Sequence, residues 1–268
     1  MMTSSKIKEI VQKRKQSIAR DVAYKKLLNQ ESFREDRITL SEAIKENSGV
    51  SIISEIKPAS PTLGEIRSNL KVEELARTME FAGSVGLSVL TEPNYFQGSY
   101  ENLKTAIKTT SIPCLMKDFL VDPVQCSIAK QLGATNLLII NSIGGQNLES
   151  NYRMVTEAGL EPLIEIHDIE EIRDIRHLHE MGLHPKLVGV NNRNLRTLKI
   201  NLNTSKIIIP KLKQEFGESI QVISESGIHT HHDIKEMLHH GADAFLIGSS
   251  IMEADDVGTK IRELRGEK

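Results

Sequence analysis

Eight short apolar stretches recur along the 268-residue chain, and between them apolar residues return every three or four positions. The short stretches predict strands at Ser51–Ile56, Gly86–Thr91, Pro113–Lys117, Asn136–Ile140, Pro162–His167, Leu187–Asn191, Gln221–Glu225 and Ala244–Gly248. The intervening stretches carry sets with helical spacing, such as Val72, Leu75, Ala76 and Met79, or Ile169, Ile172, Ile175 and Leu178. The pattern therefore predicts a strand and a helix repeated in alternation.

The spacing of these units favours one fold class. Strand starts lie about 28 residues apart, and eight such units fill a chain of about 250 residues, the usual size of a (β/α)8 TIM barrel. A doubly wound parallel sheet is the alternative. It would usually place a glycine-rich turn after the first strand, but that strand ends in Glu55-Ile56-Lys57-Pro58, without a G-x-G-x-x-G motif. We therefore expect an α/β protein with a closed barrel.

Residues 1–50 precede the first predicted strand and are rich in charge. Spaced apolar residues, namely Ile7, Ile10, Val11, Leu27 and Leu28, give this segment helical patterning and a face that can pack. We interpret it as a helical extension of a barrel at 51–268, within a single domain at 1–268. No low-complexity linker interrupts the chain.

Composition limits the possible partners. Lys plus Arg number 34 and Asp plus Glu 36, for a net charge of −2, so no global basic field attracts nucleic acid or an anionic membrane. Apolar runs are far shorter than the roughly 20 residues that span a bilayer. Cys114 and Cys126 form no disulfide framework, and the N-terminus lacks the apolar core of a secretion signal. We expect a cytoplasmic protein with no nucleic-acid or membrane partner, and a monomer is the simplest oligomeric state.

Charged and polar residues stand where the predicted strands end. Side chains alternate along a strand, so Glu55 and Lys57 share one face with Ile53. The same alternation brings polar side chains to the ends of four further strands: Lys117; Glu165 with His167; Asn191 with Arg193; and Glu225. In a barrel these strand ends form the mouth of the active-site pocket.

A single charge at a strand end is more often a solvated surface group than a catalytic one. Five strands with the same feature change this assessment, because ionised groups gathered in a barrel mouth must compensate one another. Such neighbours also shift one another's pKa values toward those useful in proton transfer. The set therefore predicts an active site.

Two glycine turns indicate a phosphorylated ligand. Ser226-Gly227 follows the seventh predicted strand and Gly248-Ser249 follows the eighth, each expected to open a helix. Barrels often bind phosphate at these positions, where backbone N–H groups and a helix N-terminus face the anion.

The nine histidines include His229, His231, His232, His239 and His240, but their spacing matches no strong metal-binding motif. A solvated helix surface explains them better. We expect no metal site.

With these residues placed, the chain resembles the indole-3-glycerol phosphate synthase family from the first strand almost to the C-terminus. The signature lies at Ile53–Ile66, ISEIKPASPTLGEI, with Glu55, Lys57, Ser60 and Pro61. Further stretches agree in order: LTEPNYFQGS from Leu90, LMKDFLVD from Leu115, PLIEIHD from Pro162, GVNNRNLRTLKIN from Gly189, ISESGIHT from Ile223 and FLIGSSIM from Phe245. Two departures, Pro58 in place of a basic residue and Thr62 in place of Ser, affect only the shape of the first loop.

The resemblance implies a lyase of tryptophan biosynthesis that needs neither cofactor nor metal. It would close the ring of 1-(2-carboxyphenylamino)-1-deoxyribulose 5-phosphate, with loss of carbon dioxide and water, to give indole-3-glycerol phosphate. Lys117 matches the general acid and Glu165 the second acid/base group. Glu55, Lys57, Asn191 and Glu225 match the remaining catalytic cluster. How Lys57, Lys117 and Glu165 divide the proton transfers stays open.

The resemblance also implies a set of substrate-binding residues. Arg193 would contact the substrate carboxylate and sugar hydroxyls. Apolar walls for the anthranilate ring would be Phe96, Phe119, Leu138 and Leu195, and the phosphate would be bound by Ser60, Ser226, Gly227, Gly248 and Ser249. Taken singly, each of the four apolar residues fits a role in the core better than one in binding.

Two other functions compete with this one. A sugar-phosphate isomerase or epimerase would be expected to carry a cysteine or aspartate pair in place of Lys117 and Glu165. A barrel that has lost catalysis and serves as a scaffold would be expected to lack at least one charged position, whereas all are present.

Overall fold

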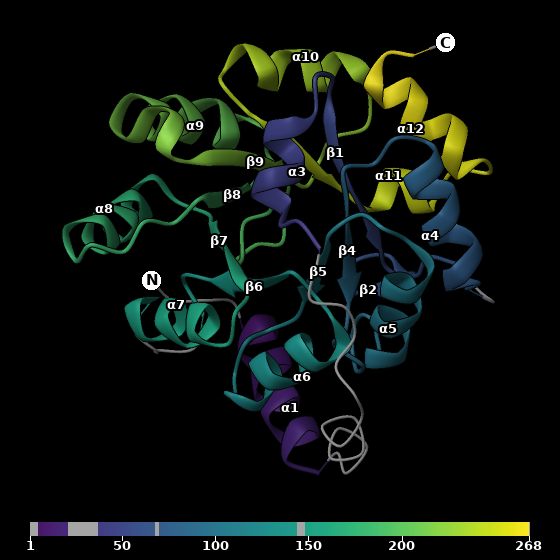
Figure 1. Ribbon diagram of the computed structural model, residues 1–268, viewed down its shortest axis with the longest axis horizontal. Helices are drawn as coiled ribbons and strands as arrows, with labels where there is room; N and C mark the ends of the chain where they lie inside the picture. Colours follow the sequence, from purple (N-terminus) through teal and green to yellow (C-terminus); the bar gives the residue numbers. More distant parts are fainter. Residues whose placement is uncertain (1–4, 21–36, 68–69, 144–147, 268) are drawn as a thin grey trace.

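The computed structural model describes residues 5–20, 37–67, 70–143 and 148–267. Eight parallel strands form a closed barrel in the order β1-β10-β9-β8-β7-β6-β5-β4 (Figure 1). Their bounds are β1 Ser51–Ile56, β4 Gly86–Leu90, β5 Cys114–Lys117, β6 Asn136–Ile140, β7 Glu161–Ile166, β8 Leu187–Asn191, β9 Gln221–Glu225 and β10 Ala244–Ile247. The predicted (β/α)8 fold is confirmed, and each predicted strand agrees with the observed one to within one residue at either end.

Helices follow the strands and cover the outside of the barrel (Figure 1). They are α4 Val72–Phe81, α5 Tyr100–Thr109, α6 Val124–Leu132, α7 Leu148–Glu157, α8 Ile172–Glu180, α9 Asn203–Phe216, α10 His231–His239, α11 Ser249–Met252 and α12 Val257–Arg265. Outward residues of the strands, such as Ile52 and Val89, pack with helical residues such as Met79 in one large buried cluster. Strands that are covered on both faces consist of nearly continuous apolar residues, and for this reason the sequence pattern predicts them well.

A second cluster fills the barrel interior. It contains the inward residues Ile53, Leu115, Leu163 and Ile223, which come from alternate strands β1, β5, β7 and β9. Four side chains from alternate strands form one layer of such a barrel. The interior is therefore a packed core, and the next residues inward along the same strands stand on top of this apolar layer.

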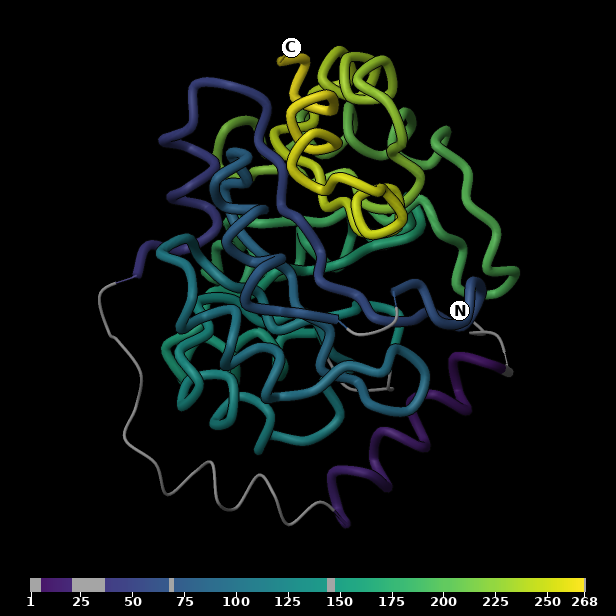
Figure 2. Tube along the Cα trace, turned by 90° about the vertical axis from the view of Figure 1, so that its right-hand side faces the viewer, coloured from purple at the N-terminus to yellow at the C-terminus, as the bar shows by residue number. Residues whose placement is uncertain are grey.

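Two helices of the N-terminal extension lie at opposite ends of the barrel (Figure 2). The helix α3, Leu40–Glu46, closes the end where strands begin: the Leu40 amide donates to Asn136 Oδ1 at 3.1 Å and the Ser41 hydroxyl donates to Glu161 Oε1 at 2.5 Å. The helix α1, Ser5–Arg20, lies at the mouth, where Ile7 and Ile10 are buried. Leu27 and Leu28 lie outside the described residues.

Arg14 anchors α1 at the mouth of the barrel. Its guanidinium donates to Asp118 through Nε at 2.9 Å and Nη2 at 2.5 Å, and to the Tyr100 hydroxyl at 2.7 Å. Arg14 is 2% exposed, and Thr91 also donates to the Asp118 carboxylate at 2.6 Å. A buried ion pair with this many hydrogen bonds holds the helix at one position, because either partner alone would be an uncompensated buried charge.

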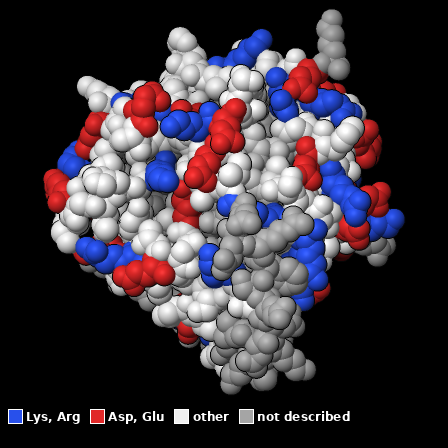
Figure 3. Space-filling view, in the orientation of Figure 1, with Lys and Arg blue, Asp and Glu red and all other residues white. Residues whose placement is uncertain are grey.

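Lys, Arg, Asp and Glu side chains are interspersed over the face of the molecule in Figure 3. This distribution over the described residues of that face agrees with the near-zero net charge. Among the described residues, every helix is too short or too polar to cross a membrane.

Candidate active site

The carboxyl ends of the strands surround a cavity of about 520 Å³. All sixteen residues selected from the sequence line it: Glu55, Lys57, Ser60, Phe96, Lys117, Phe119, Leu138, Glu165, Asn191, Arg193, Leu195, Glu225, Ser226, Gly227, Gly248 and Ser249. The predicted convergence of strand-end residues at one mouth is thus observed.

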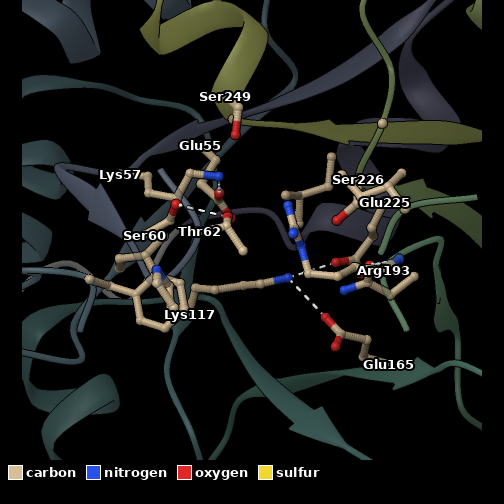
Figure 4. A pocket seen from close by; sticks show the side chains of 18 of the residues that line it. Glu55, Lys57, Ser60, Thr62, Lys117, Glu165, Arg193, Glu225, Ser226 and Ser249 are labelled. Atoms are coloured by element: carbon tan, nitrogen blue, oxygen red, sulfur yellow. Dashed lines mark hydrogen bonds and ion pairs between the residues drawn. The ribbon is translucent and has the colours of Figure 1, made fainter. Parts of the chain in front are cut away.

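The floor of the cavity is a charged layer made by Glu55, Lys117, Glu165 and Glu225. These residues come from β1, β5, β7 and β9, each two positions beyond a member of the apolar interior layer. Lys117 extends across the centre, where its Nζ donates to Glu225 Oε2 at 2.6 Å and to Glu165 Oε2 at 3.1 Å (Figure 4). Alternate-strand layering therefore brings together residues far apart in sequence.

The charges of the layer hold Lys117 protonated. Burial alone would lower its pKa, but the carboxylates of Glu225, Glu165 and Glu55 outweigh burial and raise it. Lys117 is therefore a charged hydrogen-bond donor at the centre of the cavity.

The two glutamates that share Lys117 differ in their proton affinity. Burial and the neighbouring charge of Glu165 raise the pKa of Glu225 to about 8, although Lys117 opposes the change. For Glu165, burial also acts to raise the pKa, but Lys117 and His167 outweigh it, so the pKa is lowered. Two buried carboxylates facing one ammonium cannot both ionise freely. The layer therefore pairs an ionised Glu165 with a Glu225 that retains its proton near neutral pH.

A second ion pair lies at the edge of the layer. Lys57 Nζ is 2.8 Å from Glu55 Oε1, and this lysine charge overcomes burial to lower the pKa of Glu55. Gly248 makes the pair possible: a Cβ at this position would lie 2.4 Å from Glu55 Oε1 and 2.9 Å from Lys57 Nζ. The glycine after β10 therefore leaves the space that the Glu55–Lys57 ion pair occupies.

The two predicted glycine turns differ in structure. Gly248 directly precedes α11, as expected from the sequence. Ser226 and Gly227, with φ of 66° and 86°, form a left-handed turn that does not itself open a helix. The next helix, α10, begins at His231, because Thr230 caps it by accepting from the Asp233 amide. Both turns nevertheless line the same cavity.

One wall of the cavity is apolar. The rings of Phe96 and Phe119 lie 6.2 Å apart between centroids, and both pack in a cluster with Ile7, Ile10 and Leu195. Leu138 belongs instead to the interior cluster and reaches the cavity from below. The cavity can therefore hold a planar apolar group beside the Lys117 ammonium group.

Arg193 and Asn191 lie at the end of β8. The Arg193 amide donates to Asn191 Oδ1 at 2.9 Å, and one guanidinium nitrogen donates to the Leu198 carbonyl at 3.0 Å. Burial lowers the pKa of Arg193, against the charge of Glu55. The guanidinium keeps further donors that can bind an anion.

Several cavity residues were not selected from the sequence. Ile7 and Ile10 reach the cavity from α1, and Asp118 anchors that helix. The spacing of apolar residues predicted a packing face on α1 but did not indicate which surface that face contacts. The loop between β1 and α4 contains a hairpin, β2 Ala59–Ser60 with β3 Gly64–Glu65, which was also unexpected and which brings Ser60 to the cavity.

In the described segments, no group of three or more His, Cys, Asp or Glu side chains is arranged to hold a metal ion. The carboxylates of the charged layer are instead directed to Lys117 and Lys57.

Comparisons with known proteins identify the family of the chain. The family model described as indole-3-glycerol phosphate synthase matches residues 7–264. A protein of that name from Methanocaldococcus jannaschii is 40% identical over 260 residues, covering 94% of this chain and 92% of the relative. Another from Koribacter versatilis is 38% identical over 253 residues, covering 94% and 93%.

A solved structure, thiamine phosphate pyrophosphorylase from Pyrococcus furiosus, superposes with a TM-score of 0.58 at 17% identity, covering 85% of this chain and 96% of that one. At this identity the likeness concerns the fold alone. The two sequence relatives and the family model go further, and they establish that this chain belongs to the indole-3-glycerol phosphate synthase family.

Proposed function

We propose that this chain converts 1-(2-carboxyphenylamino)-1-deoxyribulose 5-phosphate to indole-3-glycerol phosphate, carbon dioxide and water. Family membership supports the activity. The observation that carries the assignment of residues is the position of Lys117: a largely buried, protonated amine lies between an apolar wall and the carboxyl groups of Glu165 and Glu225. The reaction requires this combination of a proton donor, a site for an aromatic ring and an acid/base partner.

In the first step, the ring carbon that bears the carboxylate forms a bond to the ribulose carbonyl carbon. The carbonyl oxygen gains negative charge, and Lys117 donates a proton to it. Loss of carbon dioxide breaks the bond to the carboxyl group and restores the aromatic ring. The apolar wall of Phe96 and Phe119 holds the ring near the carbonyl and excludes water from the developing charge.

Dehydration completes the indole ring. The new hydroxyl leaves as water after it takes up a proton, and another proton leaves the amine or carbon skeleton. Glu165 is the second acid/base group in this step, since it is buried beside Lys117 and can exchange a proton with the intermediate. Lys57 and Glu55 lie close enough to the mouth to assist, with Lys57 also able to bind the substrate carboxylate.

The remaining cavity residues bind the substrate. Arg193 and Asn191 contact the carboxylate and sugar hydroxyls, where the planar guanidinium offers paired donors. The phosphate binds at Ser226-Gly227 and Gly248-Ser249, with Ser60 from the hairpin on the adjacent edge. Glu225 orders the cluster through its short contact with Lys117.

A fluorescence assay tests the activity directly. The chain contains no tryptophan, so the indole product emits against a low background. The expected result is a rise in indole emission on addition of the ribulose phosphate, with one carbon dioxide released per product. Release of no carbon dioxide would contradict the proposal, and would be the result expected of an isomerase, an epimerase or an inactive scaffold.

A further inference from the structure

His167, the first residue after β7, has a buried imidazole beside Glu165. Its side chain is 7% exposed, and its Nε2 lies 3.0 Å from Glu165 Oε1. Yet within the described part of the chain neither ring nitrogen makes a hydrogen bond of acceptable geometry. Buried polar atoms are rarely left in this state, because the lost hydration is not replaced. The imidazole of His167 is therefore a candidate for a functional role.

The two oxygens of Glu165 face different partners. Oε2 accepts from Lys117 Nζ at 3.1 Å, whereas Oε1 faces the imidazole. Glu165 lines the cavity, but His167 does not belong to the described residues that line it. The imidazole can therefore act on a bound ligand only through the carboxylate of Glu165.

The backbone at His167 is fixed by the following turn. Its amide donates to Glu171 Oε2 at 2.6 Å, and the Asp168 amide donates to the same oxygen at 3.3 Å. With the main chain held in this way, rotation of the side chain is the remaining freedom. A small rotation aligns the Nε2–H group with an oxygen that is already at hydrogen-bond distance.

We infer that His167 is the positioning residue for Glu165, and that its Nε2–H donates to Oε1 during turnover. This bond stops rotation of the carboxylate and keeps Oε2 on the side of Lys117 and the cavity. Proton exchange with the ligand then takes place at one defined oxygen. The inference rests on the proposed role of Glu165 as an acid/base group.

Two variants of nearly the same size test whether His167 acts through its Nε2–H donor. In His167→Gln the amide nitrogen can replace Nε2, while His167→Met has similar length and volume but no donor. We expect the Met variant to show a kcat roughly tenfold to a hundredfold below that of the Gln variant, the effect of one hydrogen bond to a charged group. KM should be the same in both variants, because His167 does not touch the substrate.

Controls separate this role from a structural one. Thermal unfolding of each variant shows whether it is folded, and His167→Phe, which keeps a planar ring, replaces the Met variant if that one does not fold. His177→Met on the exposed side of α8, with a side chain 58% exposed, should match the wild type.

Two results would overturn the inference while leaving the activity intact: equal kcat in the Gln and Met variants of an active enzyme, or a difference confined to KM. A wild-type protein that forms no indole product would instead refute the proposed function, and this inference with it.

Discussion

Lys117 and Glu225 are 108 residues apart in sequence, yet their side chains meet at 2.6 Å across the mouth of the barrel. The contact joins β5 to β9, which are not neighbours in the sheet. It arises because inward residues of alternate strands share one layer. The pair therefore depends on the closed ring of strands and on no local sequence feature.

Removal of the Lys117 ammonium group should abolish most of the activity. We expect Lys117→Ala to lower kcat by about 10²–10⁴-fold, the usual contribution of a general acid. Substrate affinity should change little, because the apolar wall and phosphate turns remain. Indole emission measures kcat, and Lys45→Ala on α3, at the far end of the barrel, is the control. Normal turnover in Lys117→Ala would rule out its role as the acid.

Glu165→Gln tests the second acid/base group. The amide keeps the size of the side chain but cannot exchange a proton at neutral pH. We expect a loss of kcat of about 10²–10⁴-fold, with substrate binding largely retained. Single-turnover kinetics should show the block in the chemical step rather than in product release. A variant as fast as the wild type would show that another residue carries this proton.

The raised pKa of Glu225 predicts a pH-dependent effect on stability. The folded state holds this proton up to about pH 8, whereas an unfolded glutamate releases it near its ordinary pKa of 4.5. Stability from this group is therefore complete below about 4.5 and is lost as the pH rises to about 8. Glu225→Gln cannot ionise, so its Tm relative to wild type should rise between pH 5 and pH 8. A constant or falling difference would contradict the assignment.

The Arg14–Asp118 pair predicts that α1 contributes to stability. Arg14→Ala leaves a buried carboxylate uncompensated, which should lower the free energy of unfolding by about 3–5 kcal/mol in urea titrations. Lys15→Ala changes an exposed side chain of the same helix and should leave the titration unchanged. Equal midpoints for the two variants would show that α1 packs without this anchor.

Gly248→Ala should disturb the cavity without removing any functional group. The added methyl group would meet Glu55 and Lys57 and force their ion pair apart. We expect a lower kcat/KM in the indole assay with little loss of Tm. Gly49→Ala is the matched control, because its nearest neighbouring atom would be at 3.5 Å, an ordinary contact distance. Unchanged kcat/KM in Gly248→Ala would show that the pair tolerates displacement.

The strands and the charged layer could be predicted because both follow from periodicity. Alternation along β1 and β9 places Glu55 and Glu225 inward, and the repeat of β and α elements closes the ring. Gly189 shows what alternation does not reveal: a Cβ there would lie 2.1 Å from Glu225 Oε1, so this glycine makes room for a residue on the next strand. The need for a glycine here depends on where a side chain of the neighbouring strand lies, and alternation along one strand does not reveal that position.

The placement of α1 could not be predicted for a similar reason. Its apolar face, with Ile7 and Ile10, would fit any apolar surface, and the position is fixed by the contact of Arg14 with Asp118, 104 residues away. The imidazole of His167 was expected on the inward face with Glu165, but only its burial and missing partners distinguish it from a surface histidine.

The four residues of the charged layer come in equal number from the two halves of the polypeptide. A break between β6 and β7 would leave Glu55 and Lys117 on one fragment and Glu165 and Glu225 on the other, so the second piece would carry two carboxylates with no ammonium partner from the layer. During synthesis, β10 emerges last and bridges β1 to β9. Closure of the ring by β10 therefore joins the first half of the chain to the second, and one layer then holds charged side chains from both.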